Sequence, residues 1–197
     1  MLVIGITGSF GTGKSYVSGI FKELGAKVID ADRLAHDSIK TGNPAYRKVV
    51  RLFGPSILKA GREVDRRKLG HMVFNDKAAL KKLDDIVHPE VIREIRKRML
   101  QAARGDVVVI DAPLLIEAGL AGMTDKLIVV ACPKDEQIKR CVKKFGLDKK
   151  EVLRRIRSQI SLTRKIKMAD HVVDNSGPKA ETREAAKKIW RQLHGDR

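Results

Sequence analysis

Gly8-Ser9-Phe10-Gly11-Thr12-Gly13-Lys14-Ser15 is the stretch that decides the fold, because it fits the G-x-x-x-x-G-K-[ST] pattern of a phosphate-binding loop. An apolar run, Leu2–Thr7, precedes it and predicts a buried strand. The residues that follow have apolar side chains at helical spacing, namely Val17, Ile20, Phe21 and Leu24. A plain glycine-rich turn is the alternative, but a turn requires neither the lysine nor the serine. We therefore predict a nucleotide site built on the first strand.

The residue types of this loop suit the binding of a triphosphate. Glycines let the backbone wrap closely, so that successive N–H groups point at phosphate oxygens. The start of the following helix adds its positive end. Lys14 is expected to reach the β- and γ-phosphates of ATP, and the Ser15 hydroxyl to bind Mg²⁺. The predicted nucleotide-binding residues of this segment are Gly8, Gly11, Thr12, Gly13, Lys14, Ser15 and Tyr16.

Short apolar runs rich in β-branched residues recur along the chain and predict buried parallel strands. The five runs are Leu2–Thr7, Lys27–Asp30, Val107–Ala112, Lys126–Ala131 and His171–Asp174. Helical patterns separate them, and this alternation favours a doubly wound sheet with right-handed crossovers. We therefore predict an α/β fold of the P-loop NTPase or kinase type, with a five-stranded parallel sheet flanked by helices.

The connection between the second and third strands is long and carries helical patterns of its own. We expect a helical substrate-binding insert at about 32–104, within a core formed by about 1–31 and 105–197 of a single chain. Pro89 lies in the last helical pattern of the insert, so a helix is expected to begin or kink at His88-Pro89. At the other end of the chain, a helix that contains Trp190 is expected to cover the sheet, with Trp190 as a packing residue.

The chain carries a net charge of +17, and the charge is unevenly spread. Residues 139–167 contain twelve Lys or Arg and only two acids. Three interpretations compete: a nucleic-acid footprint, a basic lid over a polyanionic substrate, and a solvated helix face in a lysine-rich protein. Aromatic residues make up only 4 % of the chain, which gives little support to base stacking. We favour a lid within about 139–167, partly solvated, and expect no obligatory nucleic-acid partner.

The compartment is inferred from cysteine usage and from the absence of targeting signals. Cys132 and Cys141 are the two cysteines, and so few predict buried free thiols in a reducing cytoplasm. No apolar run reaches 18 residues, so no transmembrane helix and no membrane partner are expected. The N-terminal run lacks a charged leader and a cleavage site, so no signal peptide is expected. The sequence does not fix the oligomeric state.

Three charged residues are the candidates for the chemistry. Asp32 follows the second strand, where it could accept a proton from a substrate hydroxyl, hold Mg²⁺ through water, or cap a helix. Asp111 ends the third strand and is a candidate second group for Mg²⁺, through water. Arg140 shares a predicted helix face with Lys144, four residues on, and could bring positive charge to the transferring phosphoryl group.

Taken together, these motifs make the chain resemble the dephospho-CoA kinases over nearly its whole length. Val28–Asp32 with His36, Asp65-Arg66 and Val87-His88-Pro89 are similar to the family's patterns in the first half. In the second half the matching segments are Pro113–Glu117, Arg155-Ile156 with Ser158-Gln159, Lys165, Ala169-Asp170 and Asp174–Gly177. The phosphate loop alone is generic, whereas the Asp-Ala-Asp, His-Pro and Pro-Leu-Leu elements in this order are specific.

The resemblance implies an activity and roles for the matching residues. It implies ATP-dependent phosphorylation of the ribose 3′-hydroxyl of dephospho-CoA, the last step of CoA biosynthesis. It implies Asp32 as the base, and Lys14 and Arg140 as stabilisers of the phosphoryl group. Asn175 would lie near the adenine of ATP. The residues implied to hold dephospho-CoA are Asp32, His36, Arg66, His88, Pro113, Leu114, Leu115 and Glu117.

The chain departs from the family pattern at three positions. The family often has a second lid arginine where Lys144 stands, and then an acid where Phe145 stands. Lysine keeps the charge but lacks the bidentate fork of arginine. Ile116 occupies a place that is usually aromatic. Two alternative functions are a nucleic-acid-associated P-loop NTPase and a P-loop kinase for another small acceptor, such as a nucleoside.

Overall fold

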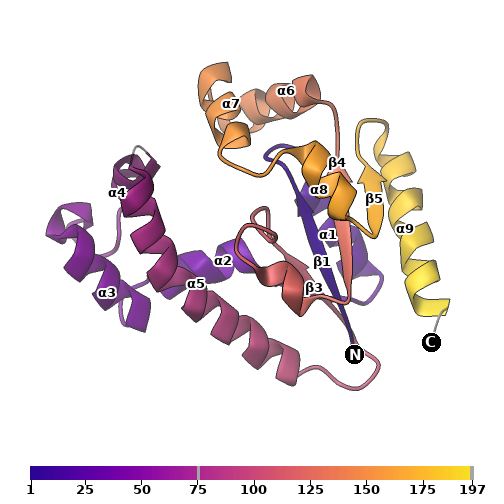
Figure 1. Ribbon diagram of the computed structural model, residues 1–197, viewed down its shortest axis with the longest axis horizontal. Helices are drawn as coiled ribbons and strands as arrows, with labels where there is room; N and C mark the ends of the chain where they lie inside the picture. The colour runs from indigo at the N-terminus through magenta and orange to yellow at the C-terminus, as the bar shows by residue number, and fades with distance from the viewer. Residues whose placement is uncertain (75, 196–197) are drawn as a thin grey trace. The chain divides into compact units, whose positions relative to one another are not determined.

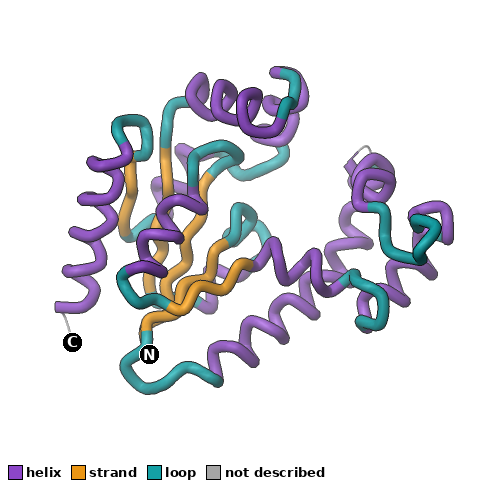
Figure 2. Tube along the Cα trace, turned by 180° about the vertical axis from the view of Figure 1, so that it is seen from behind, coloured by secondary structure: helices purple, strands orange, loops and turns teal. Residues whose placement is uncertain are grey.

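The computed structural model describes residues 1–74 and 76–195. It contains a parallel sheet of five strands in the order β2-β3-β1-β4-β5, drawn as arrows in Figure 1 and in orange in Figure 2. The strands are β1 (Leu2–Gly8), β2 (Lys27–Asp30), β3 (Val107–Asp111), β4 (Lys126–Ala131) and β5 (His171–Asp174). The predicted five-stranded sheet is confirmed, with strand ends within one residue of expectation. The first strand lies in the middle of the sheet, so the loop that follows it is central as well.

The helices divide between two compact units, of residues 1–30 with 101–197 and of residues 31–100. The first unit contains the sheet, and its strands are buried runs of Val and Ile because helices cover them. Its helices are α1 (Lys14–Glu23), η2 (Leu120–Met123), α6 (Lys134–Phe145), α7 (Lys149–Arg157), α8 (Leu162–Met168) and α9 (Lys179–Gly195).

The two faces of the sheet are covered by different segments. Alternate side chains such as Ile4 and Ile6 pack with buried residues of α1 and α9 in one core cluster. Trp190 of α9 meets Phe21 of α1 edge to face, with ring centroids 5.8 Å apart, which confirms the prediction that it packs. On the other face, a Cβ at Gly5 would lie 3.1 Å from Leu115, so the chain after β3 covers this part of the sheet.

The second unit is helical. It consists of α2 (Ala31–Ser38), α3 (Pro44–Phe53), η1 (Pro55–Ile57), α4 (Arg66–Phe74) and α5 (Lys77–Leu100). The long helix α5 is the element against which α2, α3 and α4 pack. It continues through Pro89, so of the start or kink predicted at His88-Pro89 the helix start is wrong, while the kink stays a prediction. A proline removes one backbone hydrogen bond, and the buried Val87, Val91 and Ile95 hold the helix on both sides of it.

Candidate active site

The phosphate loop has a backbone that only glycine adopts readily. Gly11 has φ +87° and Gly13 has φ +85°, both in the left-handed region. Gly13 is the N-cap of α1, and no side chain caps the helix there. The first N–H groups of α1 are therefore available to an anion. A Cβ at Gly8 would lie 2.6 Å from Thr12 Oγ1, so close packing within the loop also requires glycine there.

The side chain of Asn175 holds the backbone of the phosphate loop by a hydrogen bond. Its Nδ2 donates to the carbonyl of Thr12 at 2.7 Å, and its Oδ1 accepts from Thr182 Oγ1 at 3.0 Å. A Cβ at Gly13 would lie 2.1 Å from Asn175 Nδ2, which leaves no room for a side chain at that position. The amide of Asn175 is thus used to hold the loop backbone, and its expected place near adenine stays a prediction.

The loop lysine and the acid at the end of β3 lie together. Lys14 Nζ forms an ion pair with Asp111 Oδ1, and both side chains are largely buried. Asp111 stands opposite Ile6 of β1 and Asp30 of β2 in the sheet register. Ser15, the next loop residue, is exposed in the first turn of α1. A lysine, a hydroxyl and a carboxylate thus gather where β1 and β3 end.

Helix α6 packs against the phosphate loop and places Arg140 close to it. A Cβ at Gly11 would lie 2.6 Å from Cys141 Sγ and 2.7 Å from the Gln137 carbonyl. Arg140 Nη1 lies 3.7 Å from the place that a Cβ of Gly13 would take. Arg140 Nε also lies 3.7 Å from Glu136 Oε2 on the same helix. The structure therefore brings together Lys14, Arg140, Asp111, Asn175 and the three loop glycines.

The segment after β3 is held by buried polar contacts. The Pro113 carbonyl accepts from Thr7 Oγ1 at 3.1 Å and from Lys165 Nζ at 2.6 Å. Leu115 is fully buried, while the Leu114 side chain is 42 % exposed. Leu115 is therefore a core residue, and Leu114 is open to contact with a ligand.

Lys165 was not among the predicted site residues, but in the structure it contacts the phosphate loop and the 113–117 segment. Its side chain is 0 % exposed. Burial lowers the pKa of its ammonium, the carboxylate of Glu117 counteracts this, and repulsion from Lys14 lowers the pKa further. Glu117 Oε1 lies 2.9 Å from Lys165 Nζ and also accepts from the Ile160 N–H at 2.9 Å. Glu117 therefore acts as a structural acceptor in this geometry.

Tyr16, also predicted to bind the nucleotide, lies in α1, and its hydroxyl donates to the Lys179 carbonyl at 3.1 Å.

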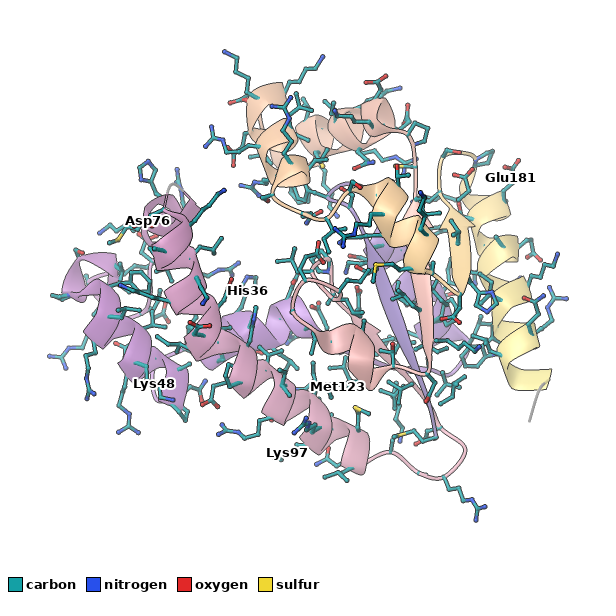
Figure 3. The ribbon with its side chains drawn as sticks, in the orientation of Figure 1. His36, Lys48, Asp76, Lys97, Met123 and Glu181 are labelled. Atoms are coloured by element: carbon teal, nitrogen blue, oxygen red, sulfur yellow. The ribbon has the colours of Figure 1, made fainter. Side chains whose placement is uncertain are left out.

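The other predicted residues belong to the helical unit, where His36 is labelled in Figure 3. Asp32 lies in the first turn of α2, inside the helix, so it is not the N-cap residue. Asp32 and His36 are four residues apart on α2 and therefore share a helix face. Arg66 Nη2 lies 2.8 Å from His36 Nε2, which joins α4 to α2 at this face.

His88 lies on α5 beside an acid of the same helix. Its Nε2 is 3.6 Å from Asp84 Oδ1. Burial raises the pKa of the Asp84 carboxyl, while a protonated His88 would lower it. His88 is thus partly engaged within the helical unit, with 37 % of its side chain exposed.

Comparison with known proteins identifies the family. The family model described as dephospho-CoA kinase matches residues 2–181. The dephospho-CoA kinase of Carboxydothermus hydrogenoformans is 46 % identical over 184 residues, which cover 92 % of this chain and 89 % of that protein. The chain belongs to the dephospho-CoA kinase family. Its match to this family spans the sheet, the helical unit and the basic stretch 139–167.

Solved structures agree with the family on the fold. The crystal structure of TT1252 from Thermus thermophilus aligns with a TM-score of 0.87 and 35 % identity over 98 % of this chain and 97 % of that one. The dephospho-CoA kinase from Campylobacter jejuni aligns with a TM-score of 0.73 and 29 % identity, with 98 % of each chain covered. In the part of the chain that the structure describes, no helix is long and apolar enough to cross a membrane.

Two glutamines were also missed by sequence reasoning. Gln137 Nε2 donates to the Cys132 carbonyl at 3.0 Å, and Gln159 Oε1 accepts from the Phe10 N–H at 3.0 Å. Gln159 had been noted only as part of the family pattern. A glutamine in a basic helical stretch carries no local signal of such a contact. The partner of Gln159 lies on the phosphate loop, far away in the sequence, and becomes visible only in the fold, whereas Cys132 is close to Gln137 in the sequence.

Proposed function

We propose that this chain transfers the γ-phosphoryl group of ATP to the ribose 3′-hydroxyl of dephospho-CoA, giving CoA and ADP. The observation that carries the proposal is the family match over residues 2–181, which includes the complete phosphate loop. A further P-loop kinase function with another acceptor has no comparable support in the chain.

At the nucleotide end, the loop would bind the triphosphate through its backbone. The N–H groups at the start of α1 and the ammonium of Lys14 face the place where the phosphates would lie. Lys14 would exchange its contact with Asp111 for contacts with the β- and γ-phosphates. Arg140, next to Gly13, would stabilise the charge that develops on the transferring group.

The residues present fit Mg²⁺, which accompanies ATP in phosphate-loop enzymes. The hydroxyl of Ser15 and the carboxylate of Asp111 are oxygen donors of the kind that Mg²⁺ prefers. We assign the ion to these two residues, with Asp111 acting through water. When bound, Mg²⁺ supplies neutralisation of charge on the phosphate oxygens.

At the acceptor end, Asp32 is proposed to accept the proton of the 3′-hydroxyl. The hydroxyl oxygen then forms a bond to the γ-phosphorus, the bond from that phosphorus to the bridging oxygen breaks, and ADP leaves. His36 and Arg66, joined to one another beside Asp32 on the helical unit, are proposed to bind anionic or polar groups of the acceptor. His88, Pro113 and Leu114 complete the proposed acceptor set, while Leu115 and Glu117 support it.

The basic stretch within 139–167 is proposed as a lid over the transferring phosphoryl group. Several of its charges pair locally, as Glu136 does with Lys139 and Arg140, so only part of the positive charge is available to substrates. Excluding water from the site protects ATP from hydrolysis. We retain the cytoplasmic location as a prediction, in keeping with the two free cysteines.

The proposal is tested by measuring ADP release from Mg·ATP with and without dephospho-CoA, together with the mass of the product. We expect ADP release that depends on dephospho-CoA and a product heavier by one phosphoryl group. Lys14→Ala is the matched negative control, since it removes the loop cation. If wild-type protein released ADP equally without the acceptor, the proposed acceptor would be wrong, and nucleosides and then nucleic acid would be tested.

A further inference from the structure

Lys165 places its ammonium among three acceptors from two neighbouring parts of the chain. The carbonyl of Pro113 lies at 2.6 Å, the carboxylate of Glu117 at 2.9 Å and the carbonyl of Gly8 at 3.5 Å. Gly8 is the last residue of β1 and the first of the phosphate loop, whereas Pro113 and Glu117 bound the segment after β3. An ammonium has three N–H donors, so all of them are used.

We infer that Lys165 is a positioning residue that sets the phosphate loop and the 113–117 segment relative to one another. Because its donors are committed to Gly8, Pro113 and Glu117, it has none left for a substrate phosphate. It therefore acts through the groups that it holds. The acceptor-side part of this inference rests on the proposed role of residues 113–117 in binding dephospho-CoA.

The cost of burying the Lys165 ammonium argues that its contacts do more than stabilise the fold. Removing an ammonium from water costs several kcal/mol, and a well-packed apolar side chain often serves stability equally well. The core of the first unit is built in that way, from side chains such as Ile6, Leu115 and Val129. A buried lysine is justified here because two backbone carbonyls must be held at a fixed separation, which an apolar side chain cannot do.

The segment between α7 and α8 also forms hydrogen bonds with the phosphate loop and with the 113–117 segment. Glu117 Oε1 accepts from the Ile160 N–H at 2.9 Å, and Gln159 Oε1 accepts from the Phe10 N–H at 3.0 Å. Residues 159 and 160 thus contact the acceptor-side segment and the phosphate loop respectively. Lys165, on the next helix, contacts both. Displacing its ammonium should therefore disturb ATP and acceptor sites together.

The test compares Lys165→Met and Glu117→Gln with Lys188→Met, which changes an exposed lysine of α9 outside the proposed lid and binding residues. Met keeps the length of the side chain without its charge, and Gln keeps an oxygen for the Ile160 N–H. Each variant is checked for folding by circular dichroism. Mg·ATP affinity is then measured by calorimetry, and the rates of ADP release and of CoA formation are measured separately.

We expect Lys165→Met to lower kcat/KM for dephospho-CoA by about 100-fold, the cost of a misplacement near 1 Å. We also expect about tenfold weaker Mg·ATP binding and more than one ADP released for each CoA formed. Glu117→Gln should lower kcat/KM by a smaller factor. The double variant should lose no more kcat/KM than Lys165→Met alone, because both changes break the same Lys165–Glu117 interaction. Lys188→Met should behave as the wild type.

A purely stabilising role predicts a different pattern. In that case Lys165→Met would lower the unfolding midpoint while the folded enzyme kept its kcat/KM, its ATP affinity and one ADP per CoA. That result, or losses that multiply in the double variant, would overturn the inference. If Lys165→Met does not fold, Glu117→Gln decides by the same criteria. If the wild type formed no CoA at all, the proposed acceptor would fail, while the Mg·ATP affinities would still test the positioning of the loop.

Discussion

Phe10 of the phosphate loop stacks on Phe145, the last residue of α6, with ring centroids 5.7 Å apart and ring planes inclined by 18°. The Arg155 guanidinium lies 5.3 Å from the centre of the Phe10 ring, and Lys144 Nζ lies 5.3 Å from that of Phe145. Each of the two stacked rings therefore has a cation near it. Phe145 is one of the positions at which the sequence is expected to depart from the family pattern. Its ring provides a contact between the loop and α6.

Phe145→Ala should loosen that contact. We expect a loss of about 1 kcal/mol in the free energy of unfolding, as for an aromatic pair. Because Phe10 belongs to the loop, ATP affinity should also fall by about fivefold, which corresponds to about 1 kcal/mol. Urea titration and calorimetry measure the two quantities. Val172→Ala, which truncates an exposed apolar residue of β5, is the control. Unchanged ATP affinity in Phe145→Ala would show that the stack does not order the loop.

Gly13→Ala should damage ATP binding through a steric conflict. The new Cβ would lie 2.1 Å from Asn175 Nδ2 and would force that amide away from the Thr12 carbonyl. The left-handed φ of +85° adds strain of about 1–2 kcal/mol for a residue with a side chain. We expect ATP affinity to fall by more than about tenfold on the basis of both effects.

Gly25→Ala is the matched control for this change. Gly25 also has a positive φ, of +107°, but nothing lies within 4 Å of a Cβ built there. It should therefore lose stability through strain alone and keep its ATP affinity in calorimetry. Equal loss of ATP affinity in the two variants would contradict the role given to the contact between Gly13 and Asn175.

The sheet could be predicted from the sequence because its signals are local. Runs such as Val107–Asp111 are both apolar and β-branched, and the phosphate loop is defined by eight consecutive residues. The helix start expected at Pro89 was wrong for the opposite reason. Packing along the whole of α5 outweighs the one hydrogen bond that a proline removes.

The supporting residues of the site could not be predicted because their partners are distant in sequence. Asn175 holds the carbonyl of Thr12, and Lys165 holds that of Gly8, each more than 150 residues away. Lys165 stands in a stretch with twelve basic residues, and nothing in its immediate neighbours distinguishes it from Lys167. Only the fold shows that one of these two lysines is buried and the other exposed.

Asp32→Asn should separate chemistry from nucleotide binding. An amide cannot accept the proton of the acceptor hydroxyl, so we expect kcat to fall by about 10²–10⁴-fold. ATP affinity should stay within about twofold, since Lys14 and the loop backbone carry that binding. Steady-state kinetics and calorimetry measure the two effects. Asp37→Asn changes another acid of α2, one that pairs with Lys40 at 2.6 Å, and should keep its turnover. Normal turnover in Asp32→Asn would exclude this residue as the base.

Asp170 should contribute stability that depends on pH. Its Oδ2 accepts from the Leu127 N–H at 2.7 Å and so fixes the start of β4. That hydrogen bond is the main cause that lowers the pKa of the Asp170 carboxyl below 3.8, and the charge of Lys126 adds to it. A carboxyl with a depressed folded-state pKa stabilises the protein fully above its ordinary value of 3.8. The contribution is lost as the pH falls through the lower, folded-state value.

Asp170→Asn keeps an oxygen for the Leu127 N–H but removes the charge, so it isolates this effect. We expect the variant to be less stable at pH 7 by at most about 1 kcal/mol, because 40 % of the Asp170 side chain is exposed and water screens its charge. As the pH falls from 3.8 through the lower, folded-state value, the two proteins should converge, since the wild-type carboxyl then becomes neutral as well. Urea unfolding across this range measures the difference, with Asp135→Asn, an exposed acid of α6, as the control. A difference that stays constant with pH would mean that the variant loses packing or hydrogen bonding rather than the charge of Asp170.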